Sequence, residues 1–328
     1  MAPVIAHVIA ASRPGGPGVL HRIDVDLPAP GPGEVLVRHT AIGVNFIDTY
    51  FRTGLYDWPV ERDLVLGAEA AGVVEATGSG VEGFSPGQRV AYTLPHGAYA
   101  SHRLVPAAAL VALPDTVSDE VAAASMLKGL TAYYLLHHSC RVQAGDQVLF
   151  HAGAGGVGLI AGQWLAHKGV TAWATAGGPE KCALARAHGY GEAIDYRTED
   201  FVARVRELSG GRGVRAVYDS VGHDTFRGSL ACLATFGTLV SFGQSSGPVT
   251  DFQVSDLAKG SFTLTRPVLF HFTTSRDWLT QAAHELFDLI GRGVLKIEVN
   301  QRYALADAAE AHRALEARKT TGSTILIP

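Results

Sequence analysis

The sequence predicts an α/β protein in which a β-rich segment is followed by a doubly wound parallel sheet. Three observations support this prediction. Residues 1–116 show short strand patterns separated by turn residues, whereas residues 148–265 show strands and helices in alternation. The first strand-to-helix junction also contains the glycine cluster Gly153-x-Gly155-x-x-Gly158. Glycines at such a junction let the chain turn tightly from a strand into a helix.

The first segment is predicted to be all β, because its apolar runs are short and turn residues interrupt them. Proline and glycine gather between residues 28 and 33, and again between residues 78 and 87. The predicted strands are 4–10, 34–42, 72–76, 89–91 and 98–104.

Helix patterns begin after this segment. Ser118 can cap a helix, and Asp119 and Glu120 suit its first turn. A second helix is predicted over 127–138, and it leads to a buried strand at 148–150. The helix after the glycine cluster should end at Gly169. Its apolar residues have helical spacing: Val157, Ile160, Ala161, Trp164 and Leu165.

Strands and helices then alternate as a doubly wound sheet requires. Counting the strand at 148–150, six strands are expected, all parallel. The others are 170–175, 193–195, 214–219, 237–242 and 261–265, with helices at 179–188, 199–209 and 225–233. After Pro267 we expect a helix over 277–291, a strand near 296–299, a helix over 306–317 and a strand over 323–328.

Composition excludes several classes of protein. The 328 residues suffice for two domains, and with 47% hydrophobic and 18% charged residues the chain should not be disordered. A net charge of −4, without a cluster of Lys and Arg, argues against nucleic acid as a partner. No apolar run reaches the ~20 residues of a membrane helix. The three cysteines, Cys140, Cys182 and Cys232, show neither disulfide nor zinc spacing. A cytoplasmic protein is predicted.

The glycine cluster has the context of a dinucleotide site, because it lies between a predicted strand and a predicted helix. NAD sites carry an Asp or Glu at the end of the second strand, and none follows Thr175 here. Lys181 instead falls in the first turn of a helix that begins at Pro179, where an anion can bind. This favours NADPH, with its additional phosphate. The alternative for Lys181, and the preferred interpretation of Glu180, is a solvated surface residue.

One motif is misleading. Gly243-Gln-Ser245-Ser-Gly247 matches the G-x-S-x-G elbow of hydrolases and follows a predicted strand. That elbow must open a helix, and the sequence after Pro248 does not have a helix pattern. We therefore reject a hydrolase and place this loop at the carboxyl end of the sheet, where a cofactor would lie.

The chain resembles the zinc-free quinone oxidoreductases of the medium-chain dehydrogenase/reductase superfamily, the zeta-crystallin-like reductases. The resemblance covers the whole chain. The motifs on which it rests are GVNFIDTY at 43–50, GAEAAG at 67–72, KGLTAYYL at 128–135, HAGAGGVG at 151–158, YDSVG at 218–222, VSFG at 240–243 and GSTILIP at 322–328.

The resemblance also bears on metal. Zinc-dependent members of the superfamily carry Cys where Asn45 stands, and Gly-His-Glu where Gly67-Ala-Glu69 stands. Ala68 has no ligand atom and Asn45 is a poor zinc ligand, so no metal site is expected. The 14 histidines do not show the H-x-x-x-H spacing of a zinc site beside a Glu base.

The resemblance implies a domain plan. Residues 1–126 would form the N-terminal part of a GroES-like, β-rich catalytic domain, and residues 127–266 a Rossmann NADP-binding domain. Residues 267–328 would return to complete the catalytic domain, with the active cleft between the two domains. The superfamily also implies a homodimer through Rossmann edge strands. Independently, residues 260–266 precede Pro267 and carry no internal Pro or Lys to protect a sheet edge.

Site residues follow from the resemblance as well. The catalytic candidates are Asn45, Tyr50 and Tyr56. The candidates for cofactor binding are Asn45, Phe46, Tyr50, Thr131, Tyr134, Gly156, Val157, Gly177, Gly178, Lys181, Tyr196, Ser220, Val221, Phe242, Gly243, Ser245 and Arg318. For Val221 and Phe242, packing at a strand end is an equal alternative. The quinone would stack on aromatic rings chosen from Tyr50, Tyr56, Trp58, Phe270 and Phe272.

The predicted function is NADPH-dependent quinone reduction without zinc, in which the cofactor supplies the hydride and the protein positions it. Two alternatives remain open at this point. One is an enone or alkenal reductase of the same fold, and the other is an RNA-binding or structural zeta-crystallin-like protein. The physiological quinone, the choice between one- and two-electron transfer and the proton donor stay open.

Overall fold

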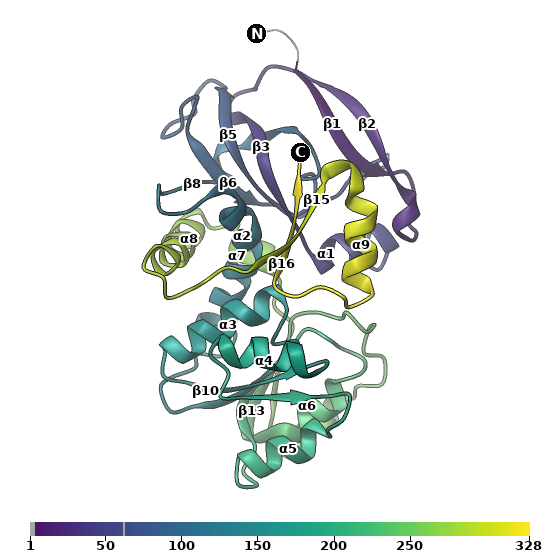
Figure 1. Ribbon diagram of the computed structural model, residues 1–328, viewed down its shortest axis with the longest axis vertical. Coiled ribbons are helices and arrows are strands. Elements are labelled where there is room, and N and C mark those ends of the chain that lie inside the picture. The colour runs from purple at the N-terminus through teal and green to yellow at the C-terminus, as the bar shows by residue number, and fades with distance from the viewer. Residues whose placement is uncertain (1–3, 62) are drawn as a thin grey trace. The chain divides into compact units, whose positions relative to one another are not determined.

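The structure, a computed structural model, describes residues 4–61 and 63–328 (Figure 1). The chain forms two compact units. The first unit contains the residues up to Leu130 together with Phe270–Gly291 and Ile297–Pro328. The second unit contains Thr131–Leu269 and Arg292–Lys296. The first unit is thus assembled from stretches that are far apart in the sequence.

The second unit is built on a parallel sheet of six strands, in the order β11-β10-β9-β12-β13-β14. This order and the parallel pairing confirm the predicted doubly wound sheet. The strands are β9 (Gln147–Phe150), β10 (Thr171–Ala176), β11 (Glu192–Asp195), β12 (Val214–Asp219), β13 (Leu233–Ser241) and β14 (Thr263–Thr265). The helices are α3 (Gly156–His167), α4 (Pro179–Ala187), α5 (Phe201–Leu208) and α6 (Phe226–Cys232).

Apolar side chains of this sheet are buried against the helices. Leu149 of β9, Val217 of β12 and Leu239 of β13 are fully buried in one core cluster, as continuous apolar strands of a parallel sheet require. The helix α3 ends with Lys168 as its C-cap, and Gly169 follows with a φ of 72°. This confirms the predicted stop at Gly169, because an L-residue rarely adopts that conformation.

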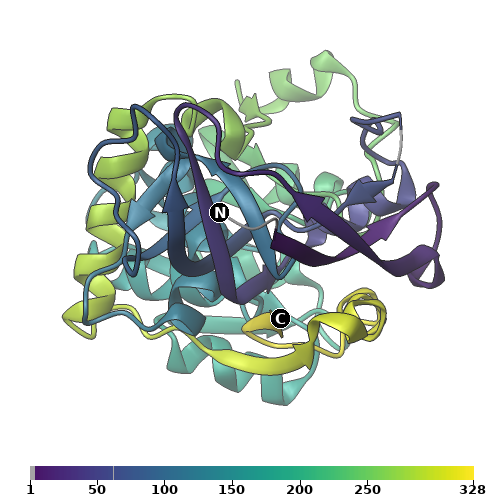
Figure 2. The same cartoon turned by 90° about the horizontal axis from the view of Figure 1, so that it is seen from above.

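The first unit contains a seven-stranded sheet in the order β15-β16-β3-β5-β6-β8, with β7 paired to β3, and a three-stranded sheet β2-β1-β4. The purple strands at the start of the chain can be followed in Figure 2. The strands are β1 (Val4–Ala11), β2 (Leu20–Leu27), β3 (Glu34–Val44), β4 (Leu64–Val65), β5 (Glu69–Thr77), β6 (Arg89–Thr93), β7 (His102–Pro106), β8 (Leu110–Ala112), β15 (Val299–Ala304) and β16 (Ser323–Ile327). The strand β16 pairs antiparallel with β3, with Ile325 opposite Gly43. The end of the chain therefore lies beside the strand that leads to Asn45.

The helices associated with this unit differ from the prediction in several places. They are α1 (Phe46–Thr53), α2 (Asp119–Tyr134, which runs on into the second unit), α7 (Leu269–Phe272), α8 (Arg276–Gly291) and α9 (Ala308–Glu316). The prediction that residues 1–116 are all β was wrong at α1, a short helix whose start signal is Asn45 with Asp48 three residues later.

Two other predictions were wrong in detail. Residues 119–134 form one helix and not two, and a π-helical turn follows over Leu135–Ser139. The helix α2 continues through Gly129, where a Cβ would come very close to the Leu286 side chain. The strand expected near 296–299 lies later, at β15. The strand β2 was missed although Ile23, Val25 and Leu27 alternate with charged or polar residues.

Candidate active site

The turn from β3 into α1 places Asn45 at the start of the helix. Asn45 has extended backbone angles and forms a capping box with Asp48, and its N–H donates to the Asp48 Oδ2 at 2.8 Å. Satisfying these first backbone donors is what lets so short a helix begin here. The side chain of Asn45 is almost fully buried.

The Glu69 carboxylate, at the start of β5, anchors this corner and is fully buried. Its Oε1 accepts from the Asn45 Nδ2 at 2.9 Å and from the Lys128 Nζ at 2.5 Å, and its Oε2 accepts from the Leu127 N–H at 2.6 Å. A charge-assisted set of three donors offsets the cost of burying the carboxylate. Gly43 makes room for it, because a Cβ at that position would overlap with Oε1 and with the Ala123 carbonyl.

Aromatic rings line the next turns of this segment. The Tyr50 ring centroid lies 6.4 Å from that of Phe46 and 5.3 Å from that of Tyr56. The structure thus brings the catalytic candidates Asn45, Tyr50 and Tyr56 into one short stretch of the first unit. Trp58 packs against the hydrophobic core of that unit, which favours a structural role for its ring.

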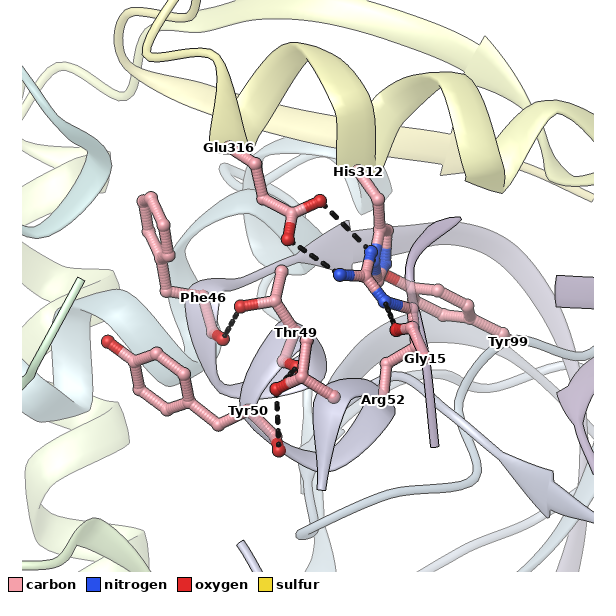
Figure 3. A network of polar contacts seen from close by, with 9 residues as sticks. Gly15, Phe46, Thr49, Tyr50, Arg52, Tyr99, His312 and Glu316 are labelled. Atoms are coloured by element: carbon pink, nitrogen blue, oxygen red, sulfur yellow. Dashed lines mark hydrogen bonds and ion pairs between the residues drawn. The ribbon is translucent and has the colours of Figure 1, made fainter. Parts of the chain in front are cut away.

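A buried polar network ties α1 to α9 (Figure 3). The fully buried Arg52 donates to both carboxylate oxygens of Glu316, at 3.1 and 2.6 Å, and its Nε donates to the Gly15 carbonyl at 3.1 Å. Its NH1 also lies 3.1 Å from the His312 Nδ1. Since Arg52 can only donate, that nitrogen of His312 must accept.

The network continues from His312 to Asp48. The His312 Nε2 lies 2.9 Å from the Tyr99 hydroxyl, which donates to the Asp48 Oδ2 at 3.0 Å. Burial, and after it the charge of Arg52, lower the pKa of His312 to about 3, so the imidazole is neutral and carries its proton on Nε2. Burial raises the pKa of Asp48 to about 7 despite the donors from Asn45 and Tyr99. Its Oδ1 has no hydrogen-bond partner among the described residues.

We expect Asp48 to make stability pH-dependent. A carboxyl with a folded pKa near 7 and an ordinary pKa of 3.8 stabilises the fold below pH 4, and this contribution is lost as the pH rises to 7. The Asp48→Asn variant should therefore show a smaller loss of unfolding free energy between pH 4 and pH 7 than the parent protein. Urea denaturation at several pH values measures the difference. Parallel pH curves for the two proteins would contradict the assignment.

In the second unit, the glycine cluster forms the turn between β9 and α3. Gly155 is the N-cap of α3, so Gly156 and Val157 lie in its first turn, where backbone N–H groups face outward. A Cβ on Gly158 would collide with the carbonyls of Ala152 and Gly153, so the helix can approach the turn only with glycine there. This geometry suits a bound pyrophosphate.

The start of α4 collects the residues expected at the adenosine phosphate. A Cβ on Gly177 would lie 2.5 Å from the Tyr196 hydroxyl and 3.3 Å from the Arg197 Nε, and one on Gly178 would lie 3.2 Å from the Arg197 NH1. Gly177, Gly178 and Tyr196 are therefore together, and Lys181 lies in the first turn of α4. Sequence reasoning missed Arg197. The signal was its position two residues after the predicted strand 193–195, beside that helix start.

A carboxylate also lies here. Asp195 ends β11, the neighbour of β10, and its Oδ1 accepts from the Gly178 N–H at 2.9 Å and from the Arg197 N–H at 3.1 Å. These two backbone donors lower the pKa of Asp195. Although no carboxylate follows Thr175, the start of α4 thus has the Asp195 carboxylate beside it. That carboxylate accepts hydrogen bonds from the backbone of the turn.

The loops after β12 and β13 lie together at the carboxyl end of the sheet. The N–H groups of Ser245 and Ser246 donate to the carbonyls of Ser220 and Val221, at 3.1 and 2.8 Å. A Cβ on Gly243 would approach Ser220 closely. The residues after Ser245 form a turn and do not open a helix, which confirms the rejection of the hydrolase elbow.

The remaining candidates divide between the units. The Phe242 ring packs 5.6 Å from that of Phe150, which favours the packing alternative for this residue. Thr131 and Tyr134 are buried near the end of α2. Arg318, in the first unit, follows α9 with a φ of 56°, which is rare outside glycine. Phe270 lies in the short helix α7, and Phe272 packs 5.2 Å from Trp278.

The described residues contain no group of three or more His, Cys, Asp or Glu side chains placed to hold a metal ion. In the same part of the chain, no helix has the length and apolar character needed to cross a membrane.

Comparison with known proteins identifies the family. The family described as "Zinc-binding dehydrogenase" matches residues 188–326, and the "Alcohol dehydrogenase GroES-like domain" matches residues 31–115. The chain is 52% identical to the quinone oxidoreductase of Pseudomonas aeruginosa, over 96% of this chain and 97% of the relative. It belongs to the quinone oxidoreductase family of the medium-chain dehydrogenases/reductases. This confirms the family that the motifs indicated, and with it the GroES-like and Rossmann architecture.

Two further members of this family and superfamily are informative. The solved structure of Escherichia coli quinone oxidoreductase complexed with NADPH has a TM-score of 0.96 and 47% identity, and the match covers 98% of this chain and 100% of that one. The 2-haloacrylate reductase of a Burkholderia species is 44% identical over 99% of both chains. The quinone oxidoreductase family fold therefore also serves a reductase named for an unsaturated acid.

Proposed function

We propose that the protein is an NADPH-dependent quinone oxidoreductase. The observation that carries the proposal is the glycine turn of the second unit, whose geometry suits a pyrophosphate, in a chain 47% identical to a quinone oxidoreductase solved with NADPH. NADPH would supply the hydride. Gly156 and Val157 would hold the pyrophosphate, and Gly177, Gly178, Lys181 and Tyr196 would surround the adenosine phosphate. Gly158 and Gly177 fit this role because neither position leaves room for a side chain: a Cβ on Gly158 would meet the Ala152 and Gly153 carbonyls, and one on Gly177 would meet the Tyr196 hydroxyl.

The chain's own residues would bind and orient the acceptor. The rings of Tyr50 and Tyr56 lie 5.3 Å apart at an angle of 58°, so a quinone would stack on the face of one of them. Asn45 lies at the start of the helix that carries Tyr50. The cofactor contacts of Thr131, Tyr134, Ser220, Val221, Phe242, Gly243, Ser245 and Arg318 remain predictions of the same proposal.

The test is NADPH oxidation with a naphthoquinone, an alkenal and 2-chloroacrylate as alternative acceptors. The proposal expects the quinone to give the highest kcat/KM, and activity should persist after dialysis against a chelator. The likeness to 2-haloacrylate reductase makes reduction of a conjugated C=C bond the second candidate. Preferential turnover of the alkenal or chloroacrylate would replace the first proposal by the second. Zinc-dependent recovery of lost activity would overturn the metal-free mechanism.

Replacing Lys181 by alanine should weaken NADPH binding about ten- to a hundredfold and leave NADH binding nearly unchanged. A charge-assisted hydrogen bond to the extra phosphate is worth about 1.5–3 kcal/mol. Quenching of intrinsic fluorescence measures both dissociation constants. Lys259→Ala, at a lysine whose side chain is 75% exposed, is the control. Equal losses for both cofactors would mean that Lys181 does not read the phosphate.

We propose a homodimer joined through β14. In the described chain β14 pairs with β13 on one side and lies at the edge of its sheet. An unpaired edge exposes backbone donors and acceptors that a second copy can satisfy. Phe236, whose N–H donates to the Gly260 carbonyl at 2.7 Å, is 71% exposed near this edge, with an unusual φ of 63°. A large exposed ring held in a disfavoured conformation supports an interface there.

Sedimentation at micromolar concentration should give twice the chain mass of 34.6 kDa. Phe236→Asn should dissociate the dimer without loss of stability, because Asn tolerates a positive φ better than Phe. Thr263→Pro should do so if its N–H crosses the interface. A parent protein that sediments as a monomer would refute this arrangement.

We further propose that the domain division at 126 and 266 and a cytoplasmic location apply to this protein. The location is supported by three buried free cysteines.

A further inference from the structure

We propose that Lys128 and Asn45 form a site for the negatively charged oxygen of the electron acceptor. The inference deepens the proposed function, since it names the group that the site would recognise: a quinone carbonyl that becomes a phenolate-like oxygen on reduction. Its basis is the arrangement of donors around Glu69, which lies wholly within the first unit.

The two nitrogens lie side by side. The Lys128 Nζ and the Asn45 Nδ2 both donate to one atom, Oε1 of Glu69, at 2.5 and 2.9 Å. The Lys128 ammonium has three N–H groups and the Asn45 amide has two. Each residue donates one of them to Glu69. Within residues 4–61 and 63–328, no other acceptor is recorded for either nitrogen. Donor capacity therefore remains on both.

Exposure distinguishes the donors from their anchor. Glu69 is 0% exposed, whereas Lys128 and Asn45 retain 5% and 6%. Lys128 and Asn45 therefore keep a small residual exposure, whereas the carboxylate that orients them has none. The Leu127 N–H donates to the other oxygen of Glu69, Oε2, and Gly43 leaves room beside Oε1 because it has no side chain.

Such a site suits the proposed reaction. Accepting a hydride converts a neutral quinone into the hydroquinone monoanion while NADPH becomes NADP+, and a proton from water then completes the hydroquinone. The negative charge that appears on oxygen is best stabilised by donors already oriented in a poorly solvated place. Glu69 provides the orientation of the two donors, and its negative charge balances that of the Lys128 ammonium.

The first test uses a spectroscopic probe and needs no turnover. p-Nitrophenol bound to the NADP+-loaded protein should ionise at lower pH than free p-nitrophenol, seen as increased absorbance of the yellow phenolate. Lys128→Met should weaken phenolate binding about tenfold or more, as expected for loss of a charge-assisted hydrogen bond. Lys259→Met, at the exposed lysine, should leave it unchanged. An unaltered ionisation of the bound probe would overturn the proposal.

The second test is kinetic. Lys128→Met should lower kcat/KM for a naphthoquinone by about 10²–10³-fold, the usual loss for one oxyanion donor, with an NADPH dissociation constant close to that of the parent. Because the single variant leaves Glu69 buried without its cation, the double variant Lys128→Met/Glu69→Gln keeps the corner neutral. The double variant should fold, bind NADPH and remain defective. Parent-like quinone turnover in it would overturn the inference.

The two proposals fail differently. A parent protein that does not reduce quinones but binds phenolate through Lys128 would refute the proposed function alone. Quinone reduction that is indifferent to Lys128 would refute this inference alone.

Discussion

Replacing Arg52 by alanine is expected to destabilise the protein by about 3 kcal/mol. The guanidinium is fully buried and bonds Glu316, the His312 ring and the Gly15 carbonyl. Its removal leaves a carboxylate, the buried His312 ring nitrogen and the part-buried Gly15 carbonyl without their donor. Unpaired buried groups cost about 1–3 kcal/mol each, less where water can enter. The Glu316 side chain is 35% exposed, so part of its loss is recovered by hydration.

The neighbouring Arg313 provides the control for this variant. Arg313 lies on α9, the helix that carries His312 and Glu316. It pairs with Glu310, and its side chain is 49% exposed. Arg313→Ala should change the free energy of unfolding by less than about 0.5 kcal/mol, as exposed pairs do. Urea denaturation followed by circular dichroism compares the two. Similar small losses in both variants would show that the network of Figure 3 contributes little.

Replacing Gly158 by alanine should both destabilise the second unit and abolish cofactor binding. The added methyl would overlap with the carbonyls of Ala152 and Gly153, which are backbone atoms and cannot rotate away. Overpacking of this kind costs about 1–3 kcal/mol, and the displaced turn would no longer present the N–H groups of α3. We expect NADPH affinity to fall by about a hundredfold or more.

Gly155→Ala separates the two effects. Its Cβ would meet a single atom, the Ala152 carbonyl oxygen, at 3.2 Å, and its φ of −82° suits any residue. This variant should therefore keep nearly the parent stability and lose only the affinity that depends on close approach of the cofactor. Thermal denaturation and a fluorescence titration measure the two quantities. Equal destabilisation of both variants would argue against a special need for glycine at 158.

The strands and helices of the second unit could be predicted from the sequence because its local sequence signals agree with the fold. Buried strands such as 148–150 are short apolar runs, and glycines or prolines mark where each helix begins or ends. The first unit was harder. The helix α1 has eight residues and lies between strands, so its capping signal at Asn45 competes with a β-rich context. The strand β2 carries its apolar residues on one face only, and their pattern was overlooked.

The site shows the same division. Motif residues near one another in sequence, such as Asn45 and Tyr50, could be proposed from the resemblance. The Arg52–Glu316 pair could not, because it joins residues 264 positions apart and no local pattern records which buried charges will meet. Lys128 is similar. It stands in a motif that signals the family, but its partner Glu69 is 59 positions away, and only the folded chain shows that the two share a corner with Asn45.

The position of β16 has a consequence for synthesis of the protein. This strand, Ser323–Ile327, lies between β15 and β3, so the largest sheet of the first unit has a gap until these residues have left the ribosome. The second unit has its six strands much earlier, by Thr265. A nascent chain would therefore carry the complete six-stranded sheet of the second unit while β3 still exposes an unpaired edge, the kind of surface that recruits chaperones or aggregates. Slow translation of residues 266–322 would prolong that vulnerable interval.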